Sequence, residues 1–231
     1  MKKYKLTNES LIFEGRTLYR IKALRDIPSW GVKAGDLGGY VQHEYNLDQS
    51  GDCWIFDNAK AMDNSQVTGN SRMYGNSYMC ENSRMYDYSL MRDNSSMRNN
   101  SSMRGNSSMC DNSRMCENSG MYGDSVMRDY SCMCENSSLI KNGMLQGETY
   151  LIKDLVVDGL ITNFLFMNWE CFLVKNKQGE LVLKAGCKVL PLSKKAIREA
   201  LIKHGIEDKE TIKIGLDLVQ SYIKLFNLNT K

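Results

Sequence analysis

The sequence lacks the marks of a membrane protein, a secreted protein or a strongly basic nucleic-acid binder. No apolar run reaches the roughly 18 residues that a membrane span needs. No apolar segment follows the basic start at residues 1–5, so we expect no signal peptide. The 231 residues hold 30 basic and 27 acidic side chains, a net charge of only +3. We therefore expect a cytoplasmic protein that binds neither a membrane nor, directly, a nucleic acid.

A six-residue repeat runs through residues 55 to 144 in fifteen copies. Each copy has a polar residue, most often Asn, then a small residue, and two positions later an apolar residue. The apolar series is Ala61, Val67, the eleven methionines from Met73 to Met133, Leu139 and Leu145. A short fixed period indicates a solenoid. A disordered low-complexity tract is the alternative, but a strict apolar position every six residues argues against it.

The phase of the repeat predicts how each hexad folds. Side chains of a strand alternate between its two faces, so in Ser77-Tyr78-Met79-Cys80 the serine and the methionine share the inner face. Tyr78 and Cys80 are then expected to point to water. Glu81 and Asn82 turn the chain, a corner that needs left-handed backbone. Three hexads close a triangular coil, and stacked coils pair their backbones. Fifteen hexads thus predict five coils of a parallel β-helix, with residue i+18 above residue i.

The segments on either side of the repeat have no hexad pattern. Short strands are expected at residues 5–7, 11–14 and 18–21, and the first irregular coil begins at about residue 37. An open β-helix end exposes unpaired backbone, so we interpret residues 1–54 as an N-terminal β cap. The domain boundaries that follow are 1–54 for the cap, 55–149 for the β-helix and 150–231 for a small α+β domain.

The C-terminal domain is expected to be a hairpin followed by two helices. Strands at 160–166, 171–174 and 181–183 surround a turn at 176–179. Ser193 is a good N-cap for a helix over 194–204, and Asp208 is a second cap. The second helix has one apolar stripe, formed by Ile212, Leu216, Val219, Ile223 and Phe226.

The hexads resemble the hexapeptide-repeat family of left-handed parallel β-helices. More narrowly, residues 15–24 and 35–41, followed by the hexads, resemble a largely uncharacterised group of phage and prophage β-helix proteins. The resemblance implies a mainly β fold with a left-handed wind, which the spacing itself does not determine. It implies no function.

Acidic residues gather along two of the three predicted corners. One corner carries Asp57, Gly75, Asp93, Asp111 and Asp129, and another carries Asp63, Glu81, Asn99, Glu117 and Glu135. Corner chemistry alone can explain both rows, because turns favour Asp, Asn and Gly. The alternative is that an acidic edge occupies a basic groove of a partner, as a mimic of a phosphate backbone. The candidate binding residues are then Asp93, Asp111, Asp129, Glu81, Glu117 and Glu135.

The other outward positions give no basic stripe and no metal site. Arg92, Arg98 and Arg104 stand in successive hexads and should point in three directions, which argues against a nucleic-acid interface. No CxxC pair or Cys/His spacing matches a zinc site, so we expect no metal, no cofactor and reduced, at least partly exposed thiols. Cys116 and Cys134 are still expected to lie about 5 Å apart at Cα, within disulfide range.

These observations favour a non-enzymatic, rigid binding scaffold. The phage resemblance suggests an inhibitor of a bacterial defence system that binds a host protein, such as one with a basic nucleic-acid-binding groove. A hexapeptide-repeat acyltransferase is one alternative, but it needs a histidine base, and neither His43 nor His204 lies in a coil. A self-assembling structural or virion component is another, because hexapeptide helices often form homo-oligomers through their flat faces.

Overall fold

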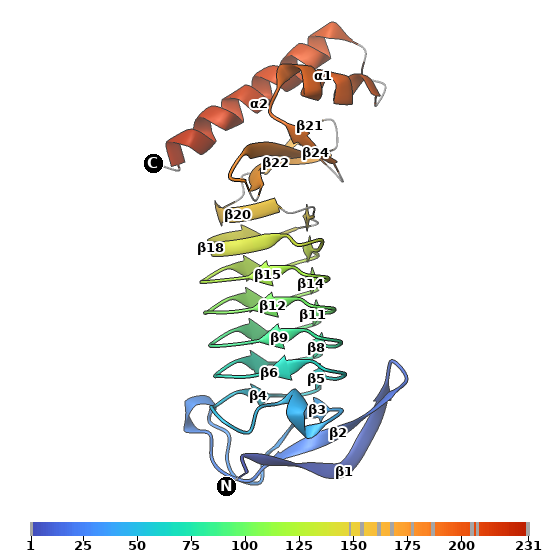
Figure 1. The fold of residues 1–231 in the computed structure, drawn as a ribbon, viewed down its shortest axis with the longest axis vertical. Helices are drawn as coiled ribbons and strands as arrows, with labels where there is room; N and C mark the ends of the chain where they lie inside the picture. The colour runs from blue at the N-terminus through green and yellow to red at the C-terminus, as the bar shows by residue number, and fades with distance from the viewer. Residues whose placement is uncertain are drawn as a thin grey trace. The chain divides into compact units, whose positions relative to one another are not determined.

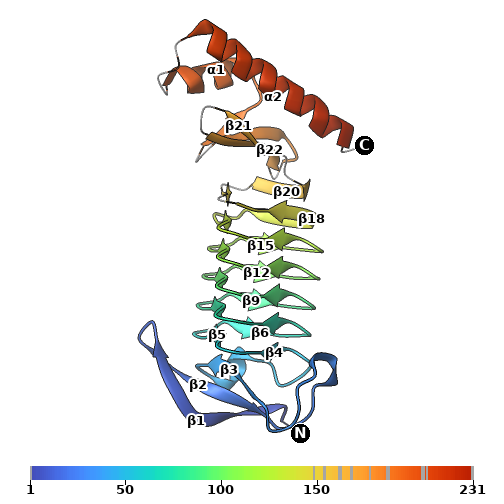
Figure 2. The same ribbon diagram turned by 180° about the vertical axis from the view of Figure 1, so that it is seen from behind.

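A computed structural model describes residues 2–147, 149–152, 155–160, 163–166, 169–176, 178–185, 188–203, 206 and 208–229 (Figures 1 and 2). The chain divides into two compact units. The first comprises Met1–Asp154 and Asp158–Leu160, and the second comprises Leu155–Val157 and Ile161–Lys231. Among the described residues, no helix is both long and apolar enough to cross a membrane.

The first unit is a parallel β-solenoid of about six turns with an antiparallel hairpin at its start. The hairpin strands are β1 (Tyr4–Phe13) and β2 (Arg16–Ala23). The expected strands at 5–7 and 11–14 are one strand, β1, with an irregularity between Leu6 and Ser10. β3 (Leu37–Val41) pairs antiparallel with β2 and parallel with β5, so the chain enters the solenoid near residue 37, as predicted. Two short 3-10 helices, Pro28–Trp30 and Glu44–Asn46, lie in the connections.

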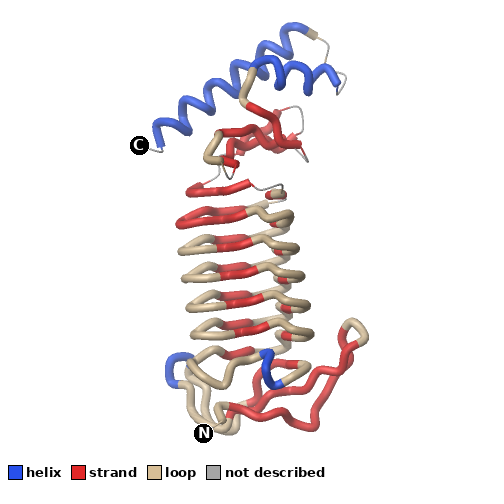
Figure 3. The backbone as a smooth tube through the Cα atoms, in the orientation of Figure 1, coloured by secondary structure: helices blue, strands red, loops and turns tan. Residues whose placement is uncertain are grey.

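The solenoid has three faces made of two-residue strands. Face 1 contains β5 (Lys60–Ala61), β8 (Tyr78–Met79), β11 (Ser96–Met97), β14 (Arg114–Met115), β17 (Cys132–Met133) and β19 (Tyr150–Leu151). Face 2 contains β4 (Trp54–Ile55), β7 (Arg72–Met73), β10 (Leu90–Met91), β13 (Ser108–Met109) and β16 (Val126–Met127). Face 3 contains β6 (Gln66–Val67), β9 (Arg84–Met85), β12 (Ser102–Met103) and β15 (Gly120–Met121). The longer β18 (Ser138–Leu145) pairs with both β15 and β16. Short strands alternate with turns along the stacked coils (Figure 3).

The register between coils is eighteen residues throughout the hexads, which confirms the predicted three-sided coil. Met91 pairs with Met109 on face 2, and Met97 pairs with Met115 on face 1. The coils also include β3 before the hexads and β19 after them, so there are more turns than the five that the hexads alone predict. Backbone pairing needs no particular side chain, so it continues where the repeat has faded.

The interior is a column of methionines. All eleven, from Met73 to Met133, are at most 1 % exposed, and Leu139, Leu145 and Leu151 continue the column. The small residue two positions earlier is buried too, from Ser65 to Ser137. Burying a methionine side chain stabilises a fold by about 1.5–3 kcal/mol. The flexible thioether fills the irregular space beside each serine, so one residue type serves all the coils from Met73 to Met133.

Near the N-terminus, the outward side chains of face 1 do not point to water as the repeat predicts. Cys80 is 2 % exposed and Tyr78 is half-buried. The reason is that β1 and β2 lie against this face. Leu18 and Tyr40 form a buried cluster with Cys80, and the ring of Phe13 meets that of Tyr78 edge-on at 5.4 Å between centroids.

The start of the chain is tied to the loop that precedes β4. Lys3 is fully buried, and its Nζ donates to the Cys53 carbonyl at 2.9 Å. The Tyr4 hydroxyl donates to the Leu47 carbonyl at 2.9 Å, and its ring packs edge-on against Trp54 with centroids 6.2 Å apart. Each polar group buried here therefore has a partner, which offsets the cost of removing it from water.

The second unit is an antiparallel sheet with two helices. Its strands are β20 (Leu155–Leu160), which straddles the division, β21 (Asn163–Phe166), β22 (Trp169–Asn176), β23 (Leu181–Ala185) and β24 (Lys188–Pro191). β22 and β23 form the predicted hairpin, and β24 adds a strand that the sequence did not predict. The helices are α1 (Lys194–Lys203) and α2 (Lys209–Asn229). Within the predicted turn, Lys177 lies outside the described residues.

Both predicted helix caps are present. The Ala196 backbone N–H donates to Ser193 Oγ at 3.1 Å, and the Thr211 N–H donates to Asp208 Oδ2 at 2.7 Å. In the apolar stripe of α2, Ile212 and Val219 are buried among residues of β22, β23 and α1, and Leu216 and Ile223 pack against this core. The side chain of Phe226 lies outside the described part of the structure. The predicted helix end at residues 204 and 205, which includes His204, lies outside the described residues.

Candidate binding surfaces on the solenoid

The corners of the solenoid are built from left-handed residues. We call the first acidic row edge 1 (Asp57, Gly75, Asp93, Asp111, Asp129), the second edge 2 (Asp63, Glu81, Asn99, Glu117, Glu135) and the third edge 3 (Gly69, Asp87, Gly105, Gly123, Lys141). Every one of these fifteen residues has a positive φ, between 51° and 75°. L-residues with side chains adopt this region at a cost of roughly 1–2 kcal/mol each, so each acidic corner residue needs a compensating contact.

Side-chain oxygens supply that contact. On edge 1, Asp129 N–H donates to Asp111 Oδ2 at 3.2 Å, and Gly147 N–H donates to Asp129 Oδ2 at 2.9 Å. On edge 2, Asn99 N–H donates to Glu81 Oε2 at 2.8 Å. Each bond spans eighteen residues and ties one coil to the next. Hydrogen bonds to a carboxylate are stronger than those between neutral groups, so some of the acidic residues along the edges serve to stabilise the stacking of the coils.

Asparagine side chains at the following position form a parallel ladder. Beside edge 2, Asn82 Nδ2 donates to Asn100 Oδ1 at 3.3 Å, Asn100 to Asn118 at 3.1 Å, and Asn118 to Asn136 at 2.9 Å. The ladder leaves little freedom at the corner, because each amide is held by the coil above and below it. The carboxylates of edge 2 therefore project from a fixed backbone.

Edge 1 has cations beside it. Arg92 Nε lies 3.7 Å from Asp93 Oδ2. The pKa of the Asp111 carboxyl is below its usual value, first because the Cys110 thiol donates to it at 3.2 Å, and then because the Asp129 N–H, Arg92 and Arg128 favour its charged form. The negative charge of this edge is thus offset by arginines on face 2.

Edge 2 lacks this compensation over its later coils. Arg98, the arginine just before this edge, is committed elsewhere: its guanidinium bonds Glu14 Oε1 at 2.6 Å and contacts the Tyr78 hydroxyl. Glu117 and Glu135 are exposed, and neither forms an ion pair with a residue in the described part of the chain. At the start of edge 2, Asp63 is paired with Arg16 Nε at 2.6 Å, so the free negative charge of this edge is confined to its later coils.

Arg92, Arg98 and Arg104 point in three directions, as predicted. Arg92 follows β10 on face 2, Arg98 follows β11 on face 1, and Arg104 follows β12 on face 3. Arg104 lies over the ring of Tyr86 at 4.6 Å from its centroid. Arg92, Arg98 and Arg104 thus lie on three different faces and form no basic stripe together.

His43, the histidine of the acyltransfer alternative, lies beside the solenoid entrance. It is exposed, it caps the 3-10 helix Glu44–Asn46, and its ring stacks on Tyr45 at 4.9 Å between centroids. A hollow of about 460 Å³ lies next to it, lined by Glu44, Tyr45, Leu47, Asp48, Gln49, Gln66 and Thr68. His43 does not line that hollow, and no described carboxylate orients its ring.

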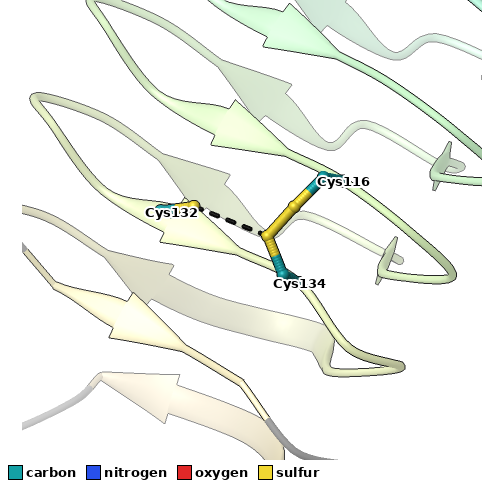
Figure 4. A group of neighbouring side chains, drawn as sticks. All are labelled: Cys116, Cys132 and Cys134. Atoms are coloured by element: carbon teal, nitrogen blue, oxygen red, sulfur yellow. Dashed lines mark hydrogen bonds between the residues drawn. A yellow bond between two sulfur atoms is a disulfide. The ribbon is translucent and has the colours of Figure 1, made fainter. Parts of the chain in front are cut away.

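The cysteines depart from the expected exposed, reduced thiols. Cys116 and Cys134 form a disulfide, with Cα atoms 4.8 Å apart, close to the predicted separation (Figure 4). The register between coils brings the two side chains together, as predicted. The prediction that these two thiols are reduced was wrong. Cys80 and Cys110 are buried rather than exposed, and burial raises the pKa of each thiol to about 11.

A third cysteine lies beside the disulfide, which sequence reasoning missed. Cys132 Sγ is 3.7 Å from Cys134 Sγ. The signal was available, because Cys132 and Cys134 are two residues apart on one face and Cys116 is eighteen residues before Cys134. Neither relation alone brings three sulfur atoms together, but the two combined do.

No protein-family model matches the sequence, and no curated protein is similar to it. The resemblance to phage-type β-helix proteins therefore gains no support from these comparisons.

Proposed function

We propose that this protein is a non-enzymatic, rigid scaffold that binds a basic surface of a host protein through edge 2. The observation that carries the proposal is the pair of exposed carboxylates at Glu117 and Glu135, which have no cation partner among the described residues. Glu81 extends the same row. On the resemblance described above, the protein is of phage or prophage type, acts in the host cytoplasm and inhibits a bacterial defence system.

Rigidity supports the proposal. The corner hydrogen bonds and the asparagine ladder hold the backbone that carries these carboxylates at the spacing of the coils, about 4.8 Å. A preorganised row loses little conformational entropy when it binds. A groove that binds nucleic acid is itself lined with cations at fixed positions. The carboxylates of edge 2, with the neutral Asn99 between Glu81 and Glu117, complement such a groove.

The proposal includes two features of the architecture. The wind is left-handed, as the resemblance implies. Residues 1–54 are a cap that closes the first coil, for which the buried contacts of Lys3 and Tyr4 are the support. A capped end also prevents edge-to-edge association of coils, which favours a discrete particle over a self-assembling polymer.

Two triple variants separate the edges. Glu81→Gln with Glu117→Gln and Glu135→Gln removes three charges from edge 2. The matched control, Asp93→Asn with Asp111→Asn and Asp129→Asn, removes three charges from edge 1. Each amide keeps a side-chain oxygen for the corner N–H of the next coil, so the fold should survive in both.

The partner is first captured from bacterial lysate with the wild-type chain and identified by mass spectrometry. Its affinity for each variant is then measured at several salt concentrations. We expect the edge 2 variant to bind at least about tenfold more weakly, a loss of 1.4 kcal/mol, and the edge 1 variant to bind nearly as the wild type does. Equal affinity of all three chains would end the proposal, and a loss confined to the edge 1 variant would move the binding row to that edge.

A further inference from the structure

Three cysteines converge on face 1 from two neighbouring coils. Cys132 and Cys134 are alternate residues of one coil and point to the same side, and Cys116 occupies the position of Cys134 one coil earlier (Figure 4). Their three sulfur atoms all lie within 4.8 Å of one another. All three side chains are half-buried, neither sealed in the core nor free in solvent.

The backbone holds this arrangement in place. β14 and β17 pair in parallel register, with Met115 opposite Met133 in the interior. The Cα atoms of Cys116 and Cys134 are therefore 4.8 Å apart for reasons that do not depend on the disulfide. A cysteine has one side-chain torsion to its sulfur, so ordering three of them on a fixed backbone costs little entropy.

We propose that, when the Cys116–Cys134 disulfide is reduced, Cys116, Cys132 and Cys134 bind one thiophilic d10 metal ion such as Zn²⁺. In the reduction, a dithiol reductant supplies two electrons and two protons. The sulfur–sulfur bond breaks, two thiols form, and the reductant becomes a disulfide. Metal binding then displaces the three thiol protons to solvent, since the ligand is the thiolate.

The distances suit such an ion. A Zn–S bond of about 2.3 Å places the sulfurs of a three-thiolate site roughly 3.8–4 Å apart. Cys132 Sγ and Cys134 Sγ are 3.7 Å apart already. No histidine or carboxylate among the described residues joins the group, so three sulfurs and one open position form the site. Thiolate ligands select Zn²⁺ or Cu⁺ over the hard ions Mg²⁺ and Ca²⁺.

Arg114 lies opposite Cys132 in the preceding coil. A bound dication stabilises all three thiolates at once. The disulfide and the metal exclude each other, since oxidation leaves Cys132 as the single thiol of the group. The site is thus open only under reducing conditions.

The test uses the full chain and Zn²⁺ as the probe. One sample is reduced with a phosphine, which becomes the phosphine oxide and leaves no competing thiol. A second sample is oxidised, and the loss of two hydrogens is verified by intact mass. Zn²⁺ affinity is measured by competition with a chromophoric chelator, and stoichiometry by native mass spectrometry. We expect one tightly bound Zn²⁺ per reduced chain and none in the oxidised chain.

Variants identify the ligands. Cys132→Ser leaves the disulfide pair intact but removes one ligand. We expect the reduced form of this variant to bind Zn²⁺ at least about tenfold more weakly, because loss of even a residue that only supports a ligand weakens metal binding by that factor. Cys110→Ser, on another face, is the control and should bind as the wild type does. Circular dichroism checks that each variant is folded.

Reduced wild type that binds no Zn²⁺ would overturn the proposal, as would reduced Cys132→Ser with wild-type affinity. If Cys132→Ser does not fold, Cys116→Ser replaces it, and the comparison of reduced with oxidised wild type decides the question without any variant. None of these outcomes depends on the acidic edges, so this proposal and the binding proposal can fail independently.

Discussion

The interior and the edges of the solenoid share one register but use it differently. Inside, the same side chain recurs: Met97 lies between Met79 and Met115, and all are excluded from water. At the edges, the backbone conformation recurs while the side chain varies among Asp, Glu, Asn, Gly and Lys. The uniform interior stabilises the fold, whereas the side chains at the edges can vary without disturbing it and are therefore available for binding. The interior should therefore be intolerant of change at every coil, whereas each edge position should respond according to its own neighbours.

The largest effect is expected inside. Met97→Ala removes a fully buried side chain, and such truncations cost about 2–5 kcal/mol because the cavity closes only partly. Met144→Ala is the matched control, since Met144 is half-buried and belongs to the outward position of β18, opposite Val126. It should cost less than about 1 kcal/mol. The free energy of unfolding of each variant is measured with denaturant. Equal losses of stability in the two variants would contradict the assignment of Met97 to the interior and Met144 to the surface.

An intermediate effect is expected at edge 3. Gly105 has a φ of 75°, and a Cβ there would lie 2.8 Å from the Gly123 carbonyl oxygen of the next coil. Gly105→Ala should therefore destabilise the protein by at least about 1–2 kcal/mol, the cost of left-handed backbone for an L-residue.

The control for Gly105→Ala is Ser102→Ala in β12 of the same coil, where the side chain points outward and is half-buried. It should change the unfolding free energy by no more than about 0.5 kcal/mol. A tolerated alanine at residue 105 would show that neighbouring coils can move apart, against the rigid edge on which the binding proposal depends.

The repeat made the solenoid predictable because one period determines every coil. The inward methionines, the corner residues and the separation of Cys116 from Cys134 all follow from a register of eighteen. The helix caps at Ser193 and Asp208 were equally predictable from the sequence, since a cap is a local hydrogen bond between residues three positions apart.

What could not be predicted depends on contacts between distant segments. The burial of Cys80 comes from β1 and β2, which lie more than fifty residues earlier and have no periodic relation to the hexads. The difference in free negative charge between the two acidic edges depends on which carboxylate pairs with each arginine. Arg98 pairs with Glu14 of the N-terminal hairpin and so does not neutralise edge 2. β24 ends at Pro191, and a short segment that contains proline is not predicted as a strand from its sequence. Proline is nevertheless tolerated at the edge of a sheet.

The smallest expected effect concerns a single carboxyl on edge 1. The folded pKa of Asp111 lies below its unfolded value, so its contribution to stability is present above about pH 4, the ordinary aspartate pKa, and is lost as the pH falls through the folded pKa. The gap in unfolding free energy between wild type and Asp111→Asn should accordingly narrow on acidification. Because Asp111 is partly exposed and solvent screens its charge, the change should be small.

Carboxyl NMR titration resolves the cause of the Asp111 shift. In Cys110→Ala the pKa should rise toward the ordinary value, because the thiol hydrogen bond is the largest contribution, whereas Cys132→Ser on face 1 should leave it unchanged. Added salt separates the contributions further, since it screens Arg92 and Arg128 more than a short hydrogen bond. If the pKa in Cys110→Ala stays low and rises only with salt, the arginines hold this carboxylate. Edge 1 would then be neutralised more completely than we infer, and the contrast with edge 2 would be greater.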